Sequence, residues 1–470
     1  MRHTFGTWCL RRVFLPVIGL GLALVACSGA PEREGVPPPA PATPGATSVE
    51  HAVAVGAWLR SIEVLAQDAP PWPDDALVAG EATSNLANGV AGKVWFFLAL
   101  HEATGEASYL RDVSRGADYL VVSLSEVVRS DQIPPPTSLY YGLPGVCVAL
   151  DAAARATGND RYSRGAASCL NTVKARARET DTGAEWSARF DDLLFGNTGT
   201  ALYLLEVAER QGDPAAGALA VRAGRALIAR AVADRGGRTW KFRRDADFVL
   251  PNFSHGAAGV GYLMAALYQY TGDEAFLDAA RGAAAYLDGI ARTDGGVYLV
   301  PYGWPNREWE GLYEAGWAHG AAGTARFFER LWQATADEGY RERVAQAARG
   351  LEALAAEAAR GEREADARLD MRFGSAGAAM FLIDAAGPNR DPALLAAARA
   401  RLDAIVASAT RDEAGLHWVT PRPAFVDRPG EPAAYTGYLT GAAGYGLLLL
   451  RYAAAVDGRP WGWRFVDDPF

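Results

Sequence analysis

The chain has few cysteines and no surplus of positive charge, and each shortage excludes a class of protein. Its 470 residues include 4 cysteines, none arranged as Cys-x-x-Cys, which excludes zinc-ribbon and iron–sulfur sites and a disulfide-built scaffold. The formal net charge of -9 argues against nucleic acid as a partner, because phosphate binding needs clustered lysine and arginine. Beyond residue 26, no apolar run reaches the ~18 residues that a membrane-spanning helix needs.

The amino-terminal segment has the composition of an export signal. Arg2, Arg11 and Arg12 precede an apolar run that ends near Ala26, so residues 1–26 are predicted to be a signal peptide. The sequence Leu-Val-Ala-Cys-Ser at residues 24–28 resembles the lipobox of bacterial lipoproteins, which implies that Cys27 is lipidated. The alternative is an ordinary signal peptide with a chance cysteine. Residues 27–48, rich in Pro, Ala, Gly and Thr, are predicted to be a tether.

We therefore expect an envelope protein that is anchored to a membrane through lipidated Cys27 and faces the periplasm or the exterior. Hydrophobic residues make up 50% of the chain and charged residues 21%, which is typical of a folded protein with a large core. Residues 49–470 are predicted to form a single domain.

That domain contains a sevenfold internal repeat. A Gly-x-x-Gly step recurs at intervals of 53, 54, 60, 64, 54 and 67 residues, and each step opens an apolar segment. In the first four units another glycine follows 13 residues after the step, which predicts a helix closed by a left-handed glycine. The first glycines of the seven steps are Gly89, Gly142, Gly196, Gly256, Gly320, Gly374 and Gly441.

A second, more polar amphipathic segment follows each turn, so each unit is predicted to be a helical hairpin. Seven hairpins give about 14 helices, with the apolar helices inside and the charged helices outside. Because such repeats bury themselves only by stacking, we expect an all-α fold, a closed double-layered α/α toroid. Its parallel inner helices place seven amino termini at one mouth, where an anionic group is favoured.

The repeat resembles a known family. The steps, with Phe-Ser-His255-Gly-Ala-Ala-Gly in the fourth unit and Gly-Trp-Ala-His319-Gly in the fifth, are similar to those of the lanthionine synthetase C-like family. The resemblance spans residues 50–455 and implies an α/α toroid with its site in the central cavity. Members with cyclase activity add a peptide cysteine thiol to a dehydroamino acid, with a zinc ion holding the thiolate. By resemblance, Asp192 and His255 are the candidate catalytic acid/base pair.

The family's zinc ligands have no counterparts here. Where the family has Trp-Cys, this chain has Trp317-Ala318, and where it has Cys-His, this chain has Arg372-Phe373. Neither alanine nor phenylalanine offers a ligand atom to zinc, so we predict no metal and no other cofactor. A rebuilt metal site from Asp192, His255, Glu314 and His319 is an alternative. Another is that Arg372 itself supplies the positive charge and binds a carboxylate or phosphate.

Other residues near the mouth are candidates for a cavity that binds substrate: Glu314, Trp317, His319 and Arg372. Aromatic residues such as Trp304, Trp309 and Tyr313 either stack on a ligand or roof the barrel. Asp192 is alternatively a helix cap, and His255 a structural histidine. Cys147 and Cys169 form a disulfide or remain two buried thiols, and we favour the thiols.

Three functions are consistent with these residues. The first is a peptide-binding or peptide-modifying relative of the cyclases that works without zinc, so the expected partner is a peptide or another small ligand in the cavity. The second is a carbohydrate-active hydrolase or epimerase that uses Asp192 and Glu314 as a carboxylate pair. The third is an envelope binding protein without catalysis, in which Asp192 and His255 are sealed into structural hydrogen bonds.

Overall fold

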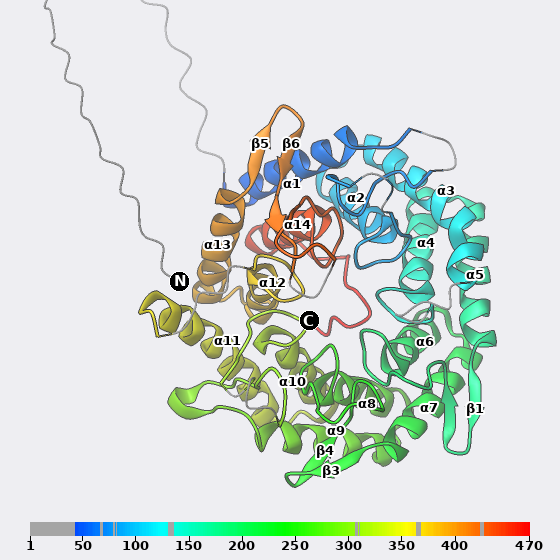
Figure 1. The fold of residues 1–470 in the computed structure, drawn as a ribbon, viewed down its shortest axis with the longest axis vertical. Helices are drawn as coiled ribbons and strands as arrows, with labels where there is room; N and C mark the ends of the chain where they lie inside the picture. The colour runs from blue at the N-terminus through cyan, green and yellow to red at the C-terminus, as the bar shows by residue number, and fades with distance from the viewer. Residues whose placement is uncertain are drawn as a thin grey trace, which may run out of the picture. The chain divides into compact units, whose positions relative to one another are not determined.

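Each Gly-x-x-Gly step begins a helix on the inside of a ring (Figure 1). The computed structural model describes residues 43–65, 69–78, 80, 82–129, 136–305, 309, 311–362, 368–423 and 427–470. The inner helices are α2 (Val90–Thr104), α4 (Leu143–Thr157), α6 (Asn197–Gln211), α8 (Ala257–Thr271), α10 (Ala321–Thr335), α12 (Ser375–Ala385) and α14 (Ala442–Asp457). They are buried on nearly all sides, as their apolar sequences predict.

A second helix packs outside each inner helix (Figure 1). These outer helices are α1 (Pro44–Ser61), α3 (Ser108–Arg129), α5 (Asp160–Ala175), α7 (Pro214–Ala229), α9 (Glu274–Asp288), α11 (Glu338–Ala359) and α13 (Pro392–Ala407). The described residues thus contain the 14 helices and seven hairpins expected of an α/α toroid. The seventh hairpin differs from expectation, because α14 packs on α1 from the start of the chain.

A ring of backbone hydrogen bonds joins the units at the start of the inner helices. It links residues that stand two positions before the first glycine of a step, at six of the seven junctions between units. At the remaining junction, the Thr200 hydroxyl donates to the Thr137 carbonyl at 2.6 Å. The N–H groups of Ala87, Leu194, Ser254, Ala318, Arg372 and Leu439 donate to the carbonyls of Tyr140, Ser254, Ala318, Arg372, Leu439 and Ala87 at 2.7–3.1 Å. The bond from Leu439 to Ala87 joins the last unit to the first, so the toroid is closed. The seven helix amino termini consequently lie at one mouth, as expected.

The step glycines are required by close backbone approach. A Cβ on Gly256 would lie 2.0 Å from the carbonyl oxygen of Leu250 in its own loop. A Cβ on Gly323 would lie 1.8 Å from the carbonyl oxygen of Trp317 and 2.8 Å from the Cβ of Phe253 in the preceding unit. The first glycine therefore permits the turn, and the second lets neighbouring units meet.

The glycines that follow the first four steps end their helices in the left-handed conformation, as predicted. Gly105, Gly158, Gly212 and Gly272 have φ values of 73°, 66°, 66° and 70°. In the fifth unit Ala336 occupies the same position with φ 56°. A short 3-10 helix, η1 (Asp294–Gly296), follows α9.

Short antiparallel strands follow three of the outer helices and were not predicted from the sequence. They are β1 (Arg178–Thr180) with β2 (Gly183–Glu185), β3 (Val232–Asp234) with β4 (Gly237–Thr239), and β5 (Thr410–Asp412) with β6 (Gly415–His417). A fourth pair is β7 (Thr420–Pro421) with β8 (Pro432–Ala433). After the first three pairs, the indoles of Trp186, Trp240 and Trp418 donate to a carbonyl 13 residues upstream on the outer helix.

The segment 461–470 lies in the centre of the ring (Figure 1). Asp467 is buried there, and its Oδ2 accepts hydrogen bonds from the Tyr140 hydroxyl and the Trp317 indole, both at 2.9 Å. Arg326 on α10 donates to the Asp467 carbonyl at 3.1 Å. Phe465 packs on Trp95 and Tyr140. The tryptophan-rich sequence at residues 461–465 therefore packs against the body.

The structure differs from the sequence-based expectations in the pairing of two cysteines and in where the first helix begins. Cys147 on α4 and Cys169 on α5 are joined by a disulfide, with Cα atoms 5.6 Å apart, so the two-thiol alternative that we favoured is wrong. The hairpin places the two side chains face to face, which the sequence alone does not show. Helix α1 begins at Pro44, inside the segment 27–48 that we expected to be a tether.

The expected signal peptide (1–26), Cys27 and the tether up to residue 42 lie outside the described residues. Within the described residues, no helix combines the length and the hydrophobicity needed to cross a bilayer.

Candidate functional site

The residue just before each first glycine lies at the mouth, and five of these residues contact one another in sequence from unit to unit. We call them the mouth residues: Asn88, Tyr141, Phe195, His255, His319, Phe373 and Thr440. The ring centroids of Tyr141 and Phe195 are 5.5 Å apart, and those of Phe195 and His255 5.4 Å. His255 and His319 follow at 5.1 Å, and His319 and Phe373 at 5.9 Å. The site is thus a run of five stacked or tilted rings.

Asp192 and His255 are brought together, as the family resemblance implied. Asp192 Oδ2 and His255 Nδ1 lie 2.5 Å apart, although the residues belong to different units. Asp192 Oδ1 also accepts the backbone N–H of Phe195 at 3.2 Å, so the carboxylate caps the turn before α6 as well. Both side chains are buried, with Asp192 1% and His255 5% exposed.

Burial dominates the titration of this pair. It raises the pKa of the Asp192 carboxyl well above its ordinary value. Burial and then the positive charge of Arg372 lower the pKa of His255 to about 3. Both effects disfavour charge, because a low-dielectric environment penalises an ion. Burial therefore favours the uncharged form of the His255 imidazole.

His319 is a second buried imidazole, 2% exposed. It lies between Tyr302, stacked at 4.3 Å, and Phe373. Its Nδ1 is buried and has no hydrogen-bond partner among the described residues. Burial, His255 and Arg372 lower the pKa of His319 well below its ordinary value.

Arg372 reaches across the mouth. Its Nη1 donates to the Tyr141 hydroxyl at 3.2 Å, and its guanidinium carbon lies 4.6 Å from the Phe373 ring centroid. The side chain is half-buried, and its charge acts on Asp192, His255 and His319. Its side chain therefore lies at the mouth with the two histidines.

Glu314 and Trp317 have other partners. Glu314 Oε1 accepts from Arg368 at 2.8 Å. The Trp317 indole points into the bore, where it donates to Asp467. The sequence predicted that both residues line a cavity that binds substrate, but spacing alone does not show which way a side chain points.

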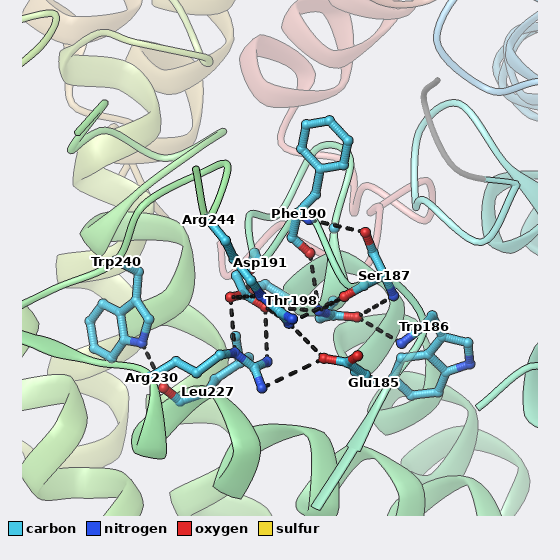
Figure 2. Close-up of polar contacts among 12 residues, drawn as sticks. Glu185, Trp186, Ser187, Phe190, Asp191, Thr198, Leu227, Arg230, Trp240 and Arg244 are labelled. Atoms are coloured by element: carbon cyan, nitrogen blue, oxygen red, sulfur yellow. Dashed lines mark hydrogen bonds and ion pairs between the residues drawn. The ribbon is translucent and has the colours of Figure 1, made fainter. Parts of the chain in front are cut away.

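Asp191 is a residue that the sequence reasoning missed. Figure 2 shows its carboxylate between Arg230 and Arg244, with Glu185 beside them. Arg230 donates to both carboxylate oxygens at 2.9 and 2.8 Å, and Arg244 at 3.1 and 3.0 Å. Burial opposes ionisation, but hydrogen bonds and charge from Arg244 and Arg230 hold the pKa of Asp191 below its usual value. This network fixes the backbone beside Asp192.

Four aromatic residues, which we call the aromatic cover, lie over the two histidines: Phe242, Phe248, Tyr302 and Trp309. Phe242 contacts His255 at 5.3 Å, and Phe248 contacts Phe242 at 5.9 Å and Trp309 at 5.0 Å. Tyr302 contacts Trp309 at 5.5 Å and His319 at 4.3 Å. Trp309 is therefore part of a roof. Trp304 and Tyr313 instead pack with Arg235 and Arg292.

The residues present do not fit the zinc ion that the family uses. Ala318 and Phe373 carry no ligand atom, and Arg372 carries a permanent positive charge. In the rebuilt site considered above, His255 Nδ1 is bonded to Asp192, and Glu314 to Arg368. Within the described ranges, no three His, Cys, Asp or Glu residues are grouped so as to hold a metal.

Comparison with known proteins places this architecture in a family. Nisin cyclase has a similar structure, with a TM-score of 0.55, 16% identity and coverage of 81% of this chain and 91% of that chain. The GH76A α-1,6-mannanase from Salegentibacter sp. HEL1_6 has a TM-score of 0.43, 14% identity and coverage of 87% and 99%. An unsaturated glucuronyl hydrolase specific for heparin has a TM-score of 0.44 and 12% identity, with coverage of 87% of this chain and 97% of that chain.

The likeness to the two hydrolases is too weak to support an inference. None of the curated proteins matches the chain. Residues 80–466 match the family described as "Lanthionine synthetase C-like protein", which is most of the chain. The protein is therefore a member of the lanthionine synthetase C-like family.

Proposed function

We propose that this protein is an exported, lipid-anchored member of its family that binds a peptide at the mouth and moves a proton on it without zinc. The observation that carries the proposal is the 2.5 Å contact between Asp192 and His255 at the mouth. In this role, Nδ1–H of His255 donates to the Asp192 carboxylate, and Nε2 accepts or returns the substrate's proton.

The surroundings of the pair support proton transfer. Burial keeps His255 neutral, which leaves a lone pair on Nε2, and the Asp192 carboxylate stabilises the imidazolium that forms when Nε2 accepts a proton. Asp191, clamped by Arg230 and Arg244, keeps the neighbouring Asp192 in place (Figure 2). The aromatic cover has to move for a peptide to reach His255, because the imidazole is only 5% exposed.

The carbohydrate alternative lacks this support. It requires Asp192 and Glu314 to act on the same bond, but Asp192 contacts His255 and Glu314 contacts Arg368. A peptide is therefore the preferred substrate class.

Export is supported by a feature independent of the leader sequence. The disulfide between Cys147 and Cys169 is typical of an oxidising compartment outside the cytosol. The lipid anchor rests on the sequence around Cys27. Replacing Cys27 with Ser should move the protein from the membrane fraction to the soluble fraction, and an unchanged membrane fraction would contradict the anchor.

The test of the site uses a short N-acetylated peptide that contains one cysteine and one dehydroalanine. Binding to residues 27–470 is measured by isothermal titration calorimetry, and thioether formation by loss of alkylatable thiol in mass spectrometry. We expect binding and turnover in the presence of a chelator. Asp192→Asn and His255→Gln should abolish turnover but leave thermal melting nearly unchanged. His101→Gln, at the opposite end of an inner helix, is the matched control.

Each result bears on a separate part of the proposal. Absence of binding would overturn the peptide assignment, and thioether formation that stops when a chelator is added would overturn the zinc-free mechanism. Peptide binding without turnover would favour a binding protein over an enzyme. A collapse of melting in both variants would show that Asp192 and His255 are structural.

A further inference from the structure

The backbone of Arg372 is fixed at the mouth from both sides. Its N–H donates to the Leu439 carbonyl at 3.1 Å, and its carbonyl accepts from the Ala318 N–H at 2.7 Å. These bonds belong to the ring that closes the toroid, so the side chain starts from a rigid point. The guanidinium then extends toward Tyr141, on the other side of the mouth.

The guanidinium is held in a way that leaves one edge unused. Nη1 bonds to the Tyr141 hydroxyl, and the flat face lies over Phe373. Nε is buried, and among the described residues neither Nε nor Nη2 has a hydrogen-bond partner. The Nε–Nη2 edge is one of the two-donor forks with which arginine binds a planar pair of oxygens.

Unlike the arginines around it, Arg372 forms no ion pair with a carboxylate of the described residues. Arg230 and Arg244 are paired with Asp191, and Arg368 is paired with Glu314. Among the described residues, no carboxylate lies within salt-bridge distance of Arg372. Its charge is nevertheless held beside two buried imidazoles, at the mouth where seven helix amino termini add partial positive charge.

His319 provides the second, independent observation. Its side chain is 2% exposed, its Nδ1 has no partner among the described residues, and its ring is fixed between Tyr302 and Phe373. A buried nitrogen without a partner costs free energy, which a ligand atom would recover. Phe373 touches both Arg372 and His319, so the two unused groups share one wall of the mouth.

We infer that the Nε–Nη2 edge of Arg372 binds a carboxylate of the peptide, beside the unpartnered His319. The inference rests on the proposed function and names the group that is recognised. A carboxylate suits the edge because its two oxygens match the two N–H groups. A phosphate dianion suits it less, because the single positive charge of Arg372 balances only one of its two negative charges.

The experiment compares the peptide of the previous section in two forms, with a free terminal carboxylate and with a terminal carboxamide. A third form carries the carboxamide and an internal glutamate, which separates a terminal from a side-chain carboxylate. Calorimetric dissociation constants are measured for the wild type, Arg372→Ala and Arg372→Lys. Arg189→Ala is the matched control, because Arg189 also stacks on a phenylalanine, Phe190, but is exposed and outside the mouth.

For the wild type, we expect the best carboxylate form to bind roughly 10- to 100-fold more tightly than the plain carboxamide. Arg372→Ala should remove this preference, and Arg372→Lys should keep part of it because lysine lacks the fork. Arg189→Ala should bind like the wild type. Thermal melting of each variant is measured alongside.

Two results would overturn the inference while the proposed function stands: equal binding of all three forms to the wild type, or an unchanged preference in Arg372→Ala. Equal or tighter competition by inorganic phosphate than by acetate would also overturn the carboxylate assignment. If none of the three peptides binds, both the proposed function and this inference are contradicted. Should Arg372→Ala fail to fold, the comparison of the three peptides on the wild type still decides.

Discussion

At the residue scale, the two buried histidines, His255 and His319, contribute differently to the pH dependence of stability. In the Asp192–His255 pair, burial raises the pKa of the carboxyl and lowers the pKa of the imidazole, so their two contributions to the pH dependence of stability partly cancel. His319 has no carboxylate partner, and its pKa is lowered in the folded state. Below pH 6.5, His319 is therefore protonated in the unfolded chain but stays neutral in the folded protein.

We expect the free energy of unfolding to fall with decreasing pH, with His319 contributing up to about 1.4 kcal/mol per pH unit below pH 6. His319→Phe, which suits the stack between Tyr302 and Phe373, should remove this part of the slope. Urea unfolding between pH 8 and pH 5 measures it. Parallel pH profiles for the wild type and the variant would show that His319 is charged in the folded protein.

The sequence identified part of the candidate site for a physical reason. Asp192, His255, His319 and Arg372 could be placed at the mouth because the repeat fixes their distance from the step glycine. Trp317 stands three residues before its glycine, where the side chain points into the bore, and no periodicity in the sequence reveals this. Asp191 was overlooked because its partners, Arg230 and Arg244, lie 39 and 53 residues away.

At the element scale, the helices were predictable and the small strands were not. Strands of two or three residues carry too little alternation to be recognised. A recurrent signal was nevertheless present: Gly183, Gly237 and Gly415 are each followed three residues later by a tryptophan. The indole then bonds to the preceding outer helix, which makes each pair of strands a clamp between consecutive elements.

The end of α10 should be open to stabilisation. Ala336 takes the left-handed conformation that glycine takes after α2, α4, α6 and α8. A Cβ in that conformation costs ~1 kcal/mol. Ala336→Gly should therefore raise the free energy of unfolding by about 1 kcal/mol, measured by urea titration. The reverse change, Gly272→Ala, should lower it by a similar amount, and a destabilised Ala336→Gly would contradict the argument.

At the scale of the whole molecule, the bore is closed by a buried polar contact. Asp467 accepts from Tyr140 and Trp317, which belong to different units of the ring. Asp467→Leu would leave both donors buried without a partner, and we expect a loss of roughly 2–4 kcal/mol in the free energy of unfolding. The neighbouring Asp468 is a control, because its ion pair with Arg326 spans 3.9 Å.

Asp468→Leu should cost less than Asp467→Leu, because Asp468 loses one distant ion pair and one hydrogen bond from the Phe470 N–H rather than two buried donors. Equal losses in the two variants would mean that the segment 461–470 is held by its aromatic side chains instead. Both variants are compared by thermal and urea unfolding of residues 27–470. The sequence predicted the ring itself, because stacked repeats must bury their faces, but it offered no signal for what fills the centre.

The split hairpin has a consequence for how this fold comes into being. Helix α1 packs on α14, and Asp75 bonds to Arg422 and Ala434 across sequence separations of 347 and 359 residues. When the chain emerges amino terminus first, from a ribosome or a translocation channel, α1 therefore stays without its packing partner until nearly the whole chain has emerged. Six hairpins can form in order as they are synthesised, but the contact between α1 and α14, which closes the ring, forms only after α14 has emerged.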